Sequence, residues 1–164
     1  MIQCVNSPEQ EIHYCSRTCC TNTMKNAILI KRINPACQVY VLYKDLITYG
    51  FREQYYTEAR ERGVLFLRYR DQDEPRVEAQ DGQLLVKVKD VILGQQFTFA
   101  PDLLSLSMAI LPAPSNPELA KLLKLPLSSE GFFMEDNLKL RPMDFTREGI
   151  YLAGACQSPK DIPD

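Results

Sequence analysis

The sequence predicts an α/β protein with a parallel sheet that is interrupted by a small antiparallel meander. In the first 70 residues, short runs rich in β-branched and aromatic residues alternate with amphipathic segments of helical period. Short connections join these segments, as in a β-α-β-α-β chain with parallel strands. The pattern then changes to strict alternation around Asp81 and Gly82, a pair that favours a tight hairpin turn.

The first half of the chain supplies three expected strands and two expected helices. Residues 1–5 (MIQCV) are apolar enough for a buried strand, and residues 16–33 repeat apolar side chains at helical spacing. The runs 38–43 (QVYVLY) and 64–69 (VLFLRY) have the composition of strands. Between them, the amphipathic segment 51–63 predicts a second helix, and its final glycine is typical of a helix C-terminus.

The second half contributes the meander and the end of the parallel sheet. Residues 76–100 are expected to form antiparallel strands inserted between two strands of the parallel sheet. The apolar segment 102–110 then returns to that sheet. Asn116 is the expected N-cap of a short helix over residues 117–124, because proline favours the first helical position. Residues 150–153 are expected to form a last apolar strand.

The composition is that of an ordinary globular protein. The 164 residues suit one domain, with 45% apolar and 24% charged residues, and the net charge of −2 gives no electrostatic reason to expect nucleic acid as a partner. No apolar run approaches the roughly 20 residues of a membrane span, and no signal-peptide pattern is present, so we expect a cytoplasmic location. Both ends interrupt expected structure, which favours a part of a larger protein or one subunit of a tight complex.

Four of the six cysteines lie within the first 20 residues: Cys4, Cys15, Cys19 and Cys20. Cys15 and Cys19 are four residues apart, so they share a face if the expected helix begins near them. Cys4 lies at the end of the first strand, where a crossover brings the start of the next helix. The four sulfurs can therefore converge on one point, beside a helix N-terminus that favours thiolates.

Four explanations compete for this group of thiols. Core packing accounts for a single cysteine such as Cys37, but it explains four neighbouring cysteines poorly. Disulfides are rare in the cytoplasm, and the adjacent Cys19 and Cys20 cannot pair without strain. The usual spacing of a zinc knuckle is absent. Spacing therefore favours a metal site and leaves both iron–sulfur and zinc open.

Four longer stretches identify a resemblance to a known family: YCSRTCCTNTMKNAILIK, VYVLYKDLITYG, FFMEDNLKLRPMD and GIYLAGACQSPKDIPD. In this order they resemble the A subunit of heterodisulfide reductase, a flavin- and iron–sulfur-containing protein with a thioredoxin-reductase-like core. The resemblance runs along nearly all 164 residues of this chain, and the family member is much longer. It implies a Rossmann-like, three-layer α/β fold of the pyridine-nucleotide-disulfide-oxidoreductase kind. Residues 1–164 would form a single NAD(P)-binding-like domain, with 131–164 as the return segment toward an FAD domain.

The resemblance also implies cofactors and their ligands. An atypical [4Fe-4S] cluster is implied at the four N-terminal cysteines, Cys4, Cys15, Cys19 and Cys20. FAD is implied nearby in the intact protein, with contacts from the end of the last strand and the segment after it, at Gly154, Ala155, Lys160 and Asp161. The implied partners are the remainder of the longer heterodisulfide-reductase-like protein and other iron–sulfur subunits. No residue of this chain is expected to be catalytic.

Two departures from ordinary flavoprotein reductases shape the expected function. The loop after the first strand reads CVNSPEQ, without the glycines that let a backbone approach a pyrophosphate, so NAD(P) is not expected there. We infer that a cluster replaces the nicotinamide as the redox neighbour of the flavin. The last strand ends in Ala-Gly-Ala-Cys (153–156), without the aspartate that holds the flavin in reductases.

The expected function is electron transfer within a heterodisulfide-reductase-like oxidoreductase, as a part that is not catalytically complete alone. The alternative from another class is a metal-free or zinc-bound structural domain that docks other subunits. A third hypothesis, an NAD(P)-dependent reductase domain, is disfavoured by the missing glycines.

Overall fold

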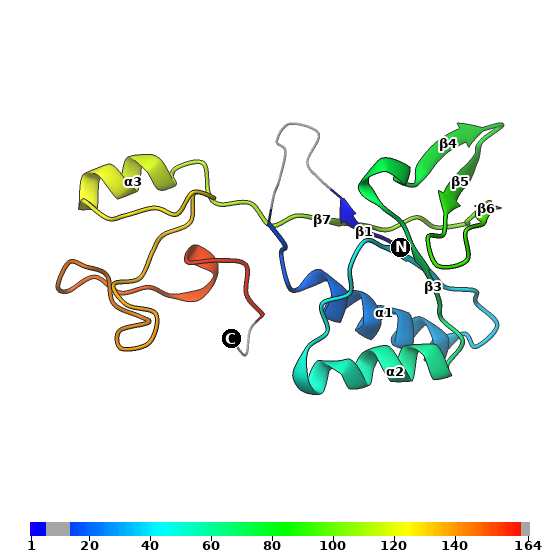
Figure 1. The fold of residues 1–164 in the computed structure, drawn as a ribbon, viewed down its shortest axis with the longest axis horizontal. Coiled ribbons are helices and arrows are strands. Elements are labelled where there is room, and N and C mark those ends of the chain that lie inside the picture. Colours follow the sequence, from blue (N-terminus) through cyan, green and yellow to red (C-terminus); the bar gives the residue numbers. More distant parts are fainter. Residues whose placement is uncertain (6–13, 162–164) are drawn as a thin grey trace. The chain divides into compact units, whose positions relative to one another are not determined.

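The computed structural model describes residues 1–5 and 14–161 (Figure 1). These residues fall into two compact units. The first contains residues 1–5 and 19–108, and the second contains residues 14–18 and 109–161. Among the helices described, none combines the length and the apolar character needed to cross a membrane.

The first unit is built on a four-stranded sheet in which neighbouring strands run parallel. Its order is β3-β2-β1-β7, with β1 (Ile2–Val5), β2 (Tyr40–Tyr43), β3 (Leu65–Arg68) and β7 (Leu106–Met108). Each strand lies within a segment that the sequence predicted to be a strand, because each is a short run of residues that suit a pleated, half-buried surface. The predicted parallel sheet is therefore confirmed.

Two helices lie side by side on one face of this sheet (Figure 1). Helix α1 (Cys19–Ile33) starts later than predicted, since Arg17 has a left-handed backbone (φ +60°) that a helix cannot contain. Helix α2 (Glu53–Glu61) follows the 3-10 turn η1 (Gly50–Arg52) and stops before Gly63 (φ +78°), as predicted. The core between helices and sheet contains Met24, Ala27, Ile28, Val39, Val41, Ala59 and Val64.

A three-stranded antiparallel sheet packs on the other face. Its order is β4-β5-β6, with β4 (Arg76–Gln80), β5 (Gln83–Lys89) and β6 (Gln96–Phe99). Asp81 (φ +51°) and Gly82 (φ +79°) form the turn between β4 and β5, with the positive φ angles that such hairpins require. The second core, between the two sheets, contains Ile2, Leu42, Leu67, Tyr69, Val86 and Val88. The predicted meander, inserted between β3 and β7, is confirmed.

The second unit has little regular structure besides helix α3 (Asn116–Leu123) and the 3-10 turn η3 (Gly154–Cys156). The expected strand over residues 150–153 is wrong, because Tyr151 pairs only with Asp144, in an isolated bridge. That segment is apolar because it helps to fill the core of this unit, which contains Ala120, Leu125, Phe133, Phe145 and Leu152. The predicted single domain, with 131–164 as a return segment, stays a prediction.

Asn116 has a role different from the one predicted. It is the first residue of α3, and Ser115 occupies the cap position. The side-chain amide of Asn116 donates a 2.9 Å hydrogen bond to the carbonyl of Gly131, so it ties the helix start to a later segment. The predicted N-cap is therefore wrong by one residue, while Pro117 does lie in the first turn.

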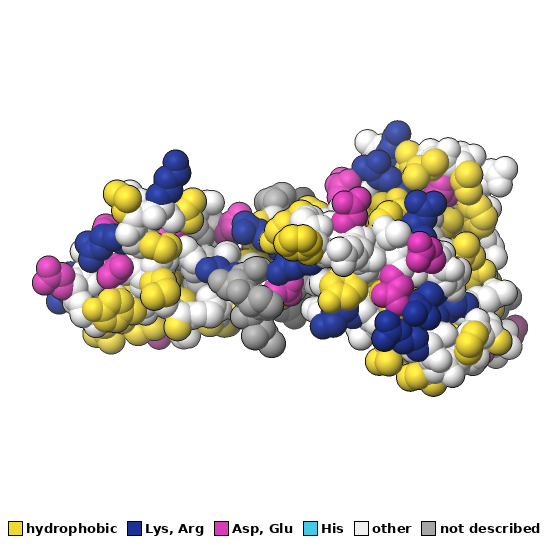
Figure 2. Space-filling view, turned by 90° about the horizontal axis from the view of Figure 1, so that it is seen from below, with side chains coloured by type: hydrophobic (Ala, Val, Ile, Leu, Met, Phe, Trp, Pro, Cys, Tyr) yellow, Lys and Arg dark blue, Asp and Glu magenta, His cyan; other side chains and the backbone are white. Residues whose placement is uncertain are grey.

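Charged side chains of both signs are intermixed on the face seen in Figure 2, in keeping with the net charge of −2. Charged side chains also join elements of the first unit. Glu58 of α2 accepts hydrogen bonds of 2.8 Å from both Arg32 of α1 and Arg62. Within the first unit, these charges therefore serve local pairing between side chains.

Candidate metal centre

Three of the four N-terminal cysteines belong to the first unit. Cys4 lies in β1, and Cys19 and Cys20 are the first two residues of α1. Cys20 is buried, with 1% of its surface exposed, while Cys4 and Cys19 are half-buried. Cys15 is exposed and belongs to the second unit. The expectation that Cys15 and Cys19 share a helical face is wrong, because α1 begins at Cys19.

The thiol of Cys20 sits against the loop that follows β2. It lies 3.7 Å from the carbonyl oxygen of Asp45, and the backbone N–H of Ile47 donates to its sulfur at 3.4 Å. Its pKa is raised, first by a hydrogen bond with the side chain of Cys19 and then by burial, with smaller contributions from the charges of Cys19 and Cys4. Cys4 and Cys19 thus both disfavour ionisation of the Cys20 thiol, and a bound cation would favour it.

The backbone of Cys4 is unusual. Its φ of +58° lies in the left-handed region, which costs free energy for residues other than glycine. The register between β1 and β7 also shifts between Ile2 and Val5. Such strain persists only where the surrounding structure imposes it, and it is common at functional sites. The strand is thus irregular at the residue that the sequence singled out as a ligand.

Two buried polar groups lack partners beside these cysteines. The side chain of Gln3 is fully buried, and neither its amide nitrogen nor its amide oxygen has a hydrogen-bond partner. The hydroxyl of Thr21, in the first turn of α1, is also buried without a hydrogen-bond partner. An unsatisfied buried group costs about 1–3 kcal/mol, so each of them calls for an explanation. Neither was predicted from the sequence, although a glutamine within the apolar run MIQCV was a usable signal.

The donor set fits an iron–sulfur cluster in its chemistry. Thiolates are the ligands of such clusters and also of structural zinc. Within residues 1–5 and 14–161, no group of three or more His, Cys, Asp or Glu side chains is gathered tightly enough to hold a metal ion. The fit rests on the chemistry of the donors. Cys4 at the end of β1 and Cys19 and Cys20 at the start of α1 supply thiols, and the unpaired side-chain amide of Gln3 supplies a hydrogen-bond donor.

The residues expected to contact FAD lie in the second unit. Gly154 (φ +61°) and Ala155 are in η3 and are exposed. Lys160 is half-buried and donates to the side-chain oxygen of Gln157, whose amide donates to Glu135 at 2.6 Å. This bond is the main cause of the lowered pKa of Glu135. The hydrogen-bonded chain holds Lys160 in place, while the FAD contacts at Gly154, Ala155, Lys160 and Asp161 stay a prediction.

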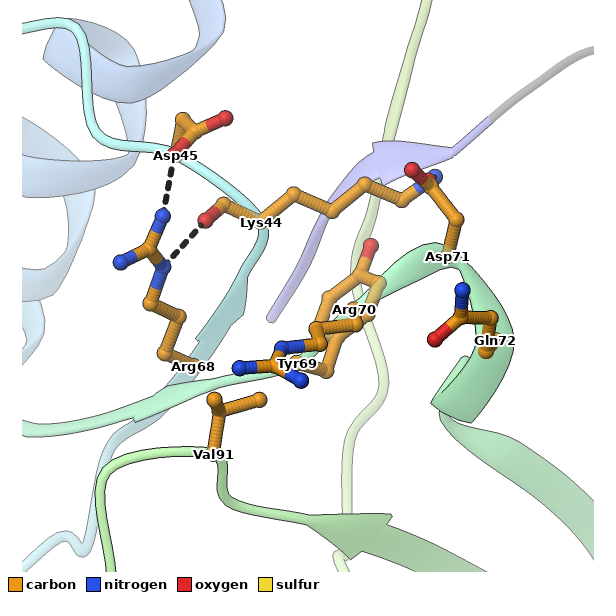
Figure 3. A pocket seen from close by; sticks show the side chains of 8 residues that line it. All are labelled: Lys44, Asp45, Arg68, Tyr69, Arg70, Asp71, Gln72 and Val91. Atoms are coloured by element: carbon orange, nitrogen blue, oxygen red, sulfur yellow. Dashed lines mark hydrogen bonds and ion pairs between the residues drawn. The ribbon is translucent and has the colours of Figure 1, made fainter.

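A polar pocket of about 340 Å³ opens where β2 and β3 end (Figure 3). Figure 3 shows Arg68 donating to the Lys44 carbonyl (2.9 Å) and to Asp45 (2.7 Å). Lys44 itself pairs with Asp71 at 2.6 Å. These pairs neutralise most of the charge in the pocket. Its lining residues are Lys44, Asp45, Arg68, Tyr69, Arg70, Asp71, Gln72 and Val91.

Comparisons with known proteins identify relatives of this chain. No protein-family model matches it. The iron–sulfur A subunit of the CoB–CoM heterodisulfide reductase from Methanocaldococcus jannaschii is 44% identical over 170 residues, which cover 99% of this chain and 25% of that protein. The A subunit of the ferredoxin:CoB–CoM heterodisulfide reductase from Methanosarcina acetivorans is 38% identical over 167 residues, covering 100% of this chain and 21% of that protein.

A third relative comes from a different genus. This protein of Archaeoglobus profundus, named as similar to the A subunit of heterodisulfide reductase, is 35% identical over 165 residues, covering 99% of this chain and 23% of that protein. The chain thus spans about a quarter of the length of the curated relatives it matches. The resemblance seen in the sequence is confirmed: the chain belongs to the family of heterodisulfide reductase A subunits, of which it matches a part.

Proposed function

We propose that this chain is the electron-transfer part of a heterodisulfide-reductase-like oxidoreductase and that it carries a [4Fe-4S] cluster beside FAD. The relatives are named as subunits of such reductases, one of them as an iron–sulfur subunit. The single observation that carries the cluster proposal is the position of three cysteines at two neighbouring element ends: Cys4 at the end of β1, and Cys19 and Cys20 at the start of α1. The fourth proposed ligand is Cys15.

Each proposed ligand has a distinct part in holding the cluster. Cys20 is buried and already accepts an N–H from Ile47, so its thiolate is the best shielded from water. Cys4 lies in β1, and Cys19 lies next to Cys20 at the start of α1, where the helix dipole favours negative charge. When bound, the cluster supplies a one-electron carrier whose potential depends on hydrogen bonds to its sulfurs and on burial.

The fold proposal is Rossmann-like. The strand order β3-β2-β1-β7, with helices on one face and the meander on the other, supports it. In such folds the loop after β1 holds a pyrophosphate, and here that sequence, CVNSPEQ, has no glycine. Loop residues 6–13 lie outside the described part of the chain. We propose that the cluster stands in the place of the nicotinamide.

FAD is the proposed electron partner of the cluster in the intact protein. Gly154 and Ala155 present an exposed backbone turn, suited to close approach of a flavin. Lys160 is the proposed cation beside the isoalloxazine ring, and Asp161 is proposed to follow it in the same contact. The partners are proposed to be the remainder of the longer protein and other iron–sulfur subunits, all in the cytoplasm.

The test is a comparison of iron and sulfide contents after strictly anaerobic purification of the protein with its native partners. Cys20→Ser is expected to remove about four irons per chain and one reduced-state EPR signal. The matched control is Cys37→Ser, because Cys37 is half-buried and packs beside the core of the helices. Zinc in the wild type, or an iron content unchanged by Cys20→Ser, would contradict the proposal.

A further inference from the structure

Gln3 is an unusual residue to find inside a sheet. It lies in β1 with none of its surface exposed, and both polar atoms of its side chain lack partners. Its neighbour Ile2 points into the core shared with the antiparallel sheet. Because side chains alternate along a strand, Gln3 points to the opposite face, on which α1 packs. An amide is therefore buried on the face of the sheet that the helices cover, at a cost that the described structure does not offset.

The backbone of Gln3 is held firmly. Its carbonyl oxygen accepts a 2.6 Å hydrogen bond from the phenol of Tyr69, in a fully buried contact. The residue after it is Cys4, with the left-handed backbone. Gln3 is thus fixed in position on its carbonyl side, while the hydrogen-bonding capacity of its side chain is unused.

The unpaired polar groups are neighbours of the proposed ligands in the sequence. In the described part of the chain, only Gln3 and Thr21 have buried side-chain polar atoms without a partner. Gln3 precedes Cys4, and Thr21 follows Cys20. Buried polar groups in native proteins are almost always satisfied, so unsatisfied ones point to a missing partner. Each of these groups is next in sequence to a proposed ligand, so a cluster held by those ligands would supply sulfur acceptors close to both along the chain.

We propose that the side-chain amide of Gln3 donates an N–H hydrogen bond to a sulfur of the cluster and thereby raises its reduction potential. This inference rests on the proposed function. Hydrogen bonds to the sulfurs stabilise the reduced cluster, which carries one more negative charge than the oxidised cluster. Gln3 is a positioning residue that tunes the cluster without being a ligand. The hydroxyl of Thr21 is a second donor available at the start of α1.

The experiment is a potentiometric EPR titration of the anaerobically purified protein with its native partners. Gln3→Met removes the amide at nearly constant volume, so iron content should stay at the wild-type value. The equilibrium constant for one-electron reduction should fall about tenfold, which equals about 59 mV. The control is Thr23→Val, which removes another buried polar group of α1 that already pairs with Ser107 and should leave the potential unchanged.

Three outcomes separate this inference from the proposed function. A Gln3→Met protein with full iron and an unchanged potential would overturn the role of Gln3 and leave the cluster standing. An iron content and a reduced-state EPR spectrum that Cys20→Ser leaves unchanged would overturn both. If the Gln3→Met protein does not retain iron, the test uses the wild type only. Its glutamine side-chain nitrogen is labelled with 15N, and pulsed EPR of the reduced cluster should detect a nitrogen coupled to the cluster. The absence of that coupling would overturn the inference.

Discussion

The phenol of Tyr69 donates a 2.6 Å hydrogen bond to the backbone carbonyl of Gln3, across 66 positions of the chain. Tyr69 follows β3, and Gln3 lies in β1, with β2 between these two strands in the sheet. The pKa of Tyr69 is raised, first by burial and then by the charge of Cys4. The phenol therefore stays protonated as a donor over the physiological pH range. It links the polar pocket, which Tyr69 lines, to the strand that carries Cys4.

Tyr69→Phe should destabilise the first unit by about 1–3 kcal/mol, because it leaves the buried carbonyl of Gln3 without this donor. Denaturant unfolding measures the change. The matched control is Tyr55→Phe on α2, whose side chain is 39% exposed and which should change stability much less. Equal losses in the two variants would mean that the hydrogen bond to Gln3 contributes nothing specific.

Met24 should be the most costly residue of α1 to truncate. Its side chain is fully buried in the core between the helices and the sheet. Met24→Ala is expected to lower stability by about 2–5 kcal/mol through lost burial and the cavity left behind. Met108→Ala, at a position 46% exposed in β7, is the control and should cost far less. A small effect of Met24→Ala would show that the core collapses around the cavity.

The pattern of the sequence was sufficient for elements that depend on local chemistry. Asp81 and Gly82 specify the hairpin because their conformation is set within two residues. Gly63 marks the end of α2 for the same reason. The apolar composition of residues 150–153 gave a wrong strand prediction, because an apolar run can also pack as an irregular segment when no neighbouring strand pairs with it. The helical spacing of apolar residues also gave no sign of the left-handed backbone of Arg17, because of which α1 begins only at Cys19.

The candidate site was predictable in part. The crowding of cysteines was visible in the sequence, and three of them do lie at the end of β1 and the start of α1. The unpaired amide of Gln3 was not predictable, because its burial depends on tertiary packing over that face of the sheet. The hydrogen bond from Tyr69 to the backbone carbonyl of Gln3 depends on the pairing of strands that are far apart in the chain. These relationships arise only from tertiary structure.

Glu58 should give the helix pair a measurable pH dependence. Hydrogen bonds from Arg32 and then Arg62 lower the pKa of this carboxyl below its ordinary value of 4.5. A lowered folded-state pKa means that the stabilisation is fully present above pH 4.5 and is lost as the pH falls through the folded value. Glu58→Gln should therefore slightly destabilise the protein at pH 7 and have no effect at pH 2. Unfolding midpoints of the wild type and of the Glu58→Gln variant between pH 2 and pH 7 measure this difference in stability. A difference that persists at pH 2 would mean that ionised Glu58 is not its cause.

Removal of iron should expose the proposed ligands to alkylation in a fixed order. In the loaded protein, Cys4, Cys15, Cys19 and Cys20 should all resist iodoacetamide, whereas Cys37 and Cys156 keep their intrinsic reactivity. After anaerobic chelation of iron, the exposed Cys15 should react early. Cys20 should react last, at least about tenfold more slowly than Cys15, because it is buried, its pKa is raised and only the thiolate attacks.

Mass spectrometry of peptides sampled over time measures these rates. The order separates two sources of protection, since burial alone would shield Cys20 before and after chelation and would never shield Cys15. A Cys15 that reacts equally fast with and without iron is therefore not a ligand. The proposed cluster would then need a fourth ligand other than Cys15.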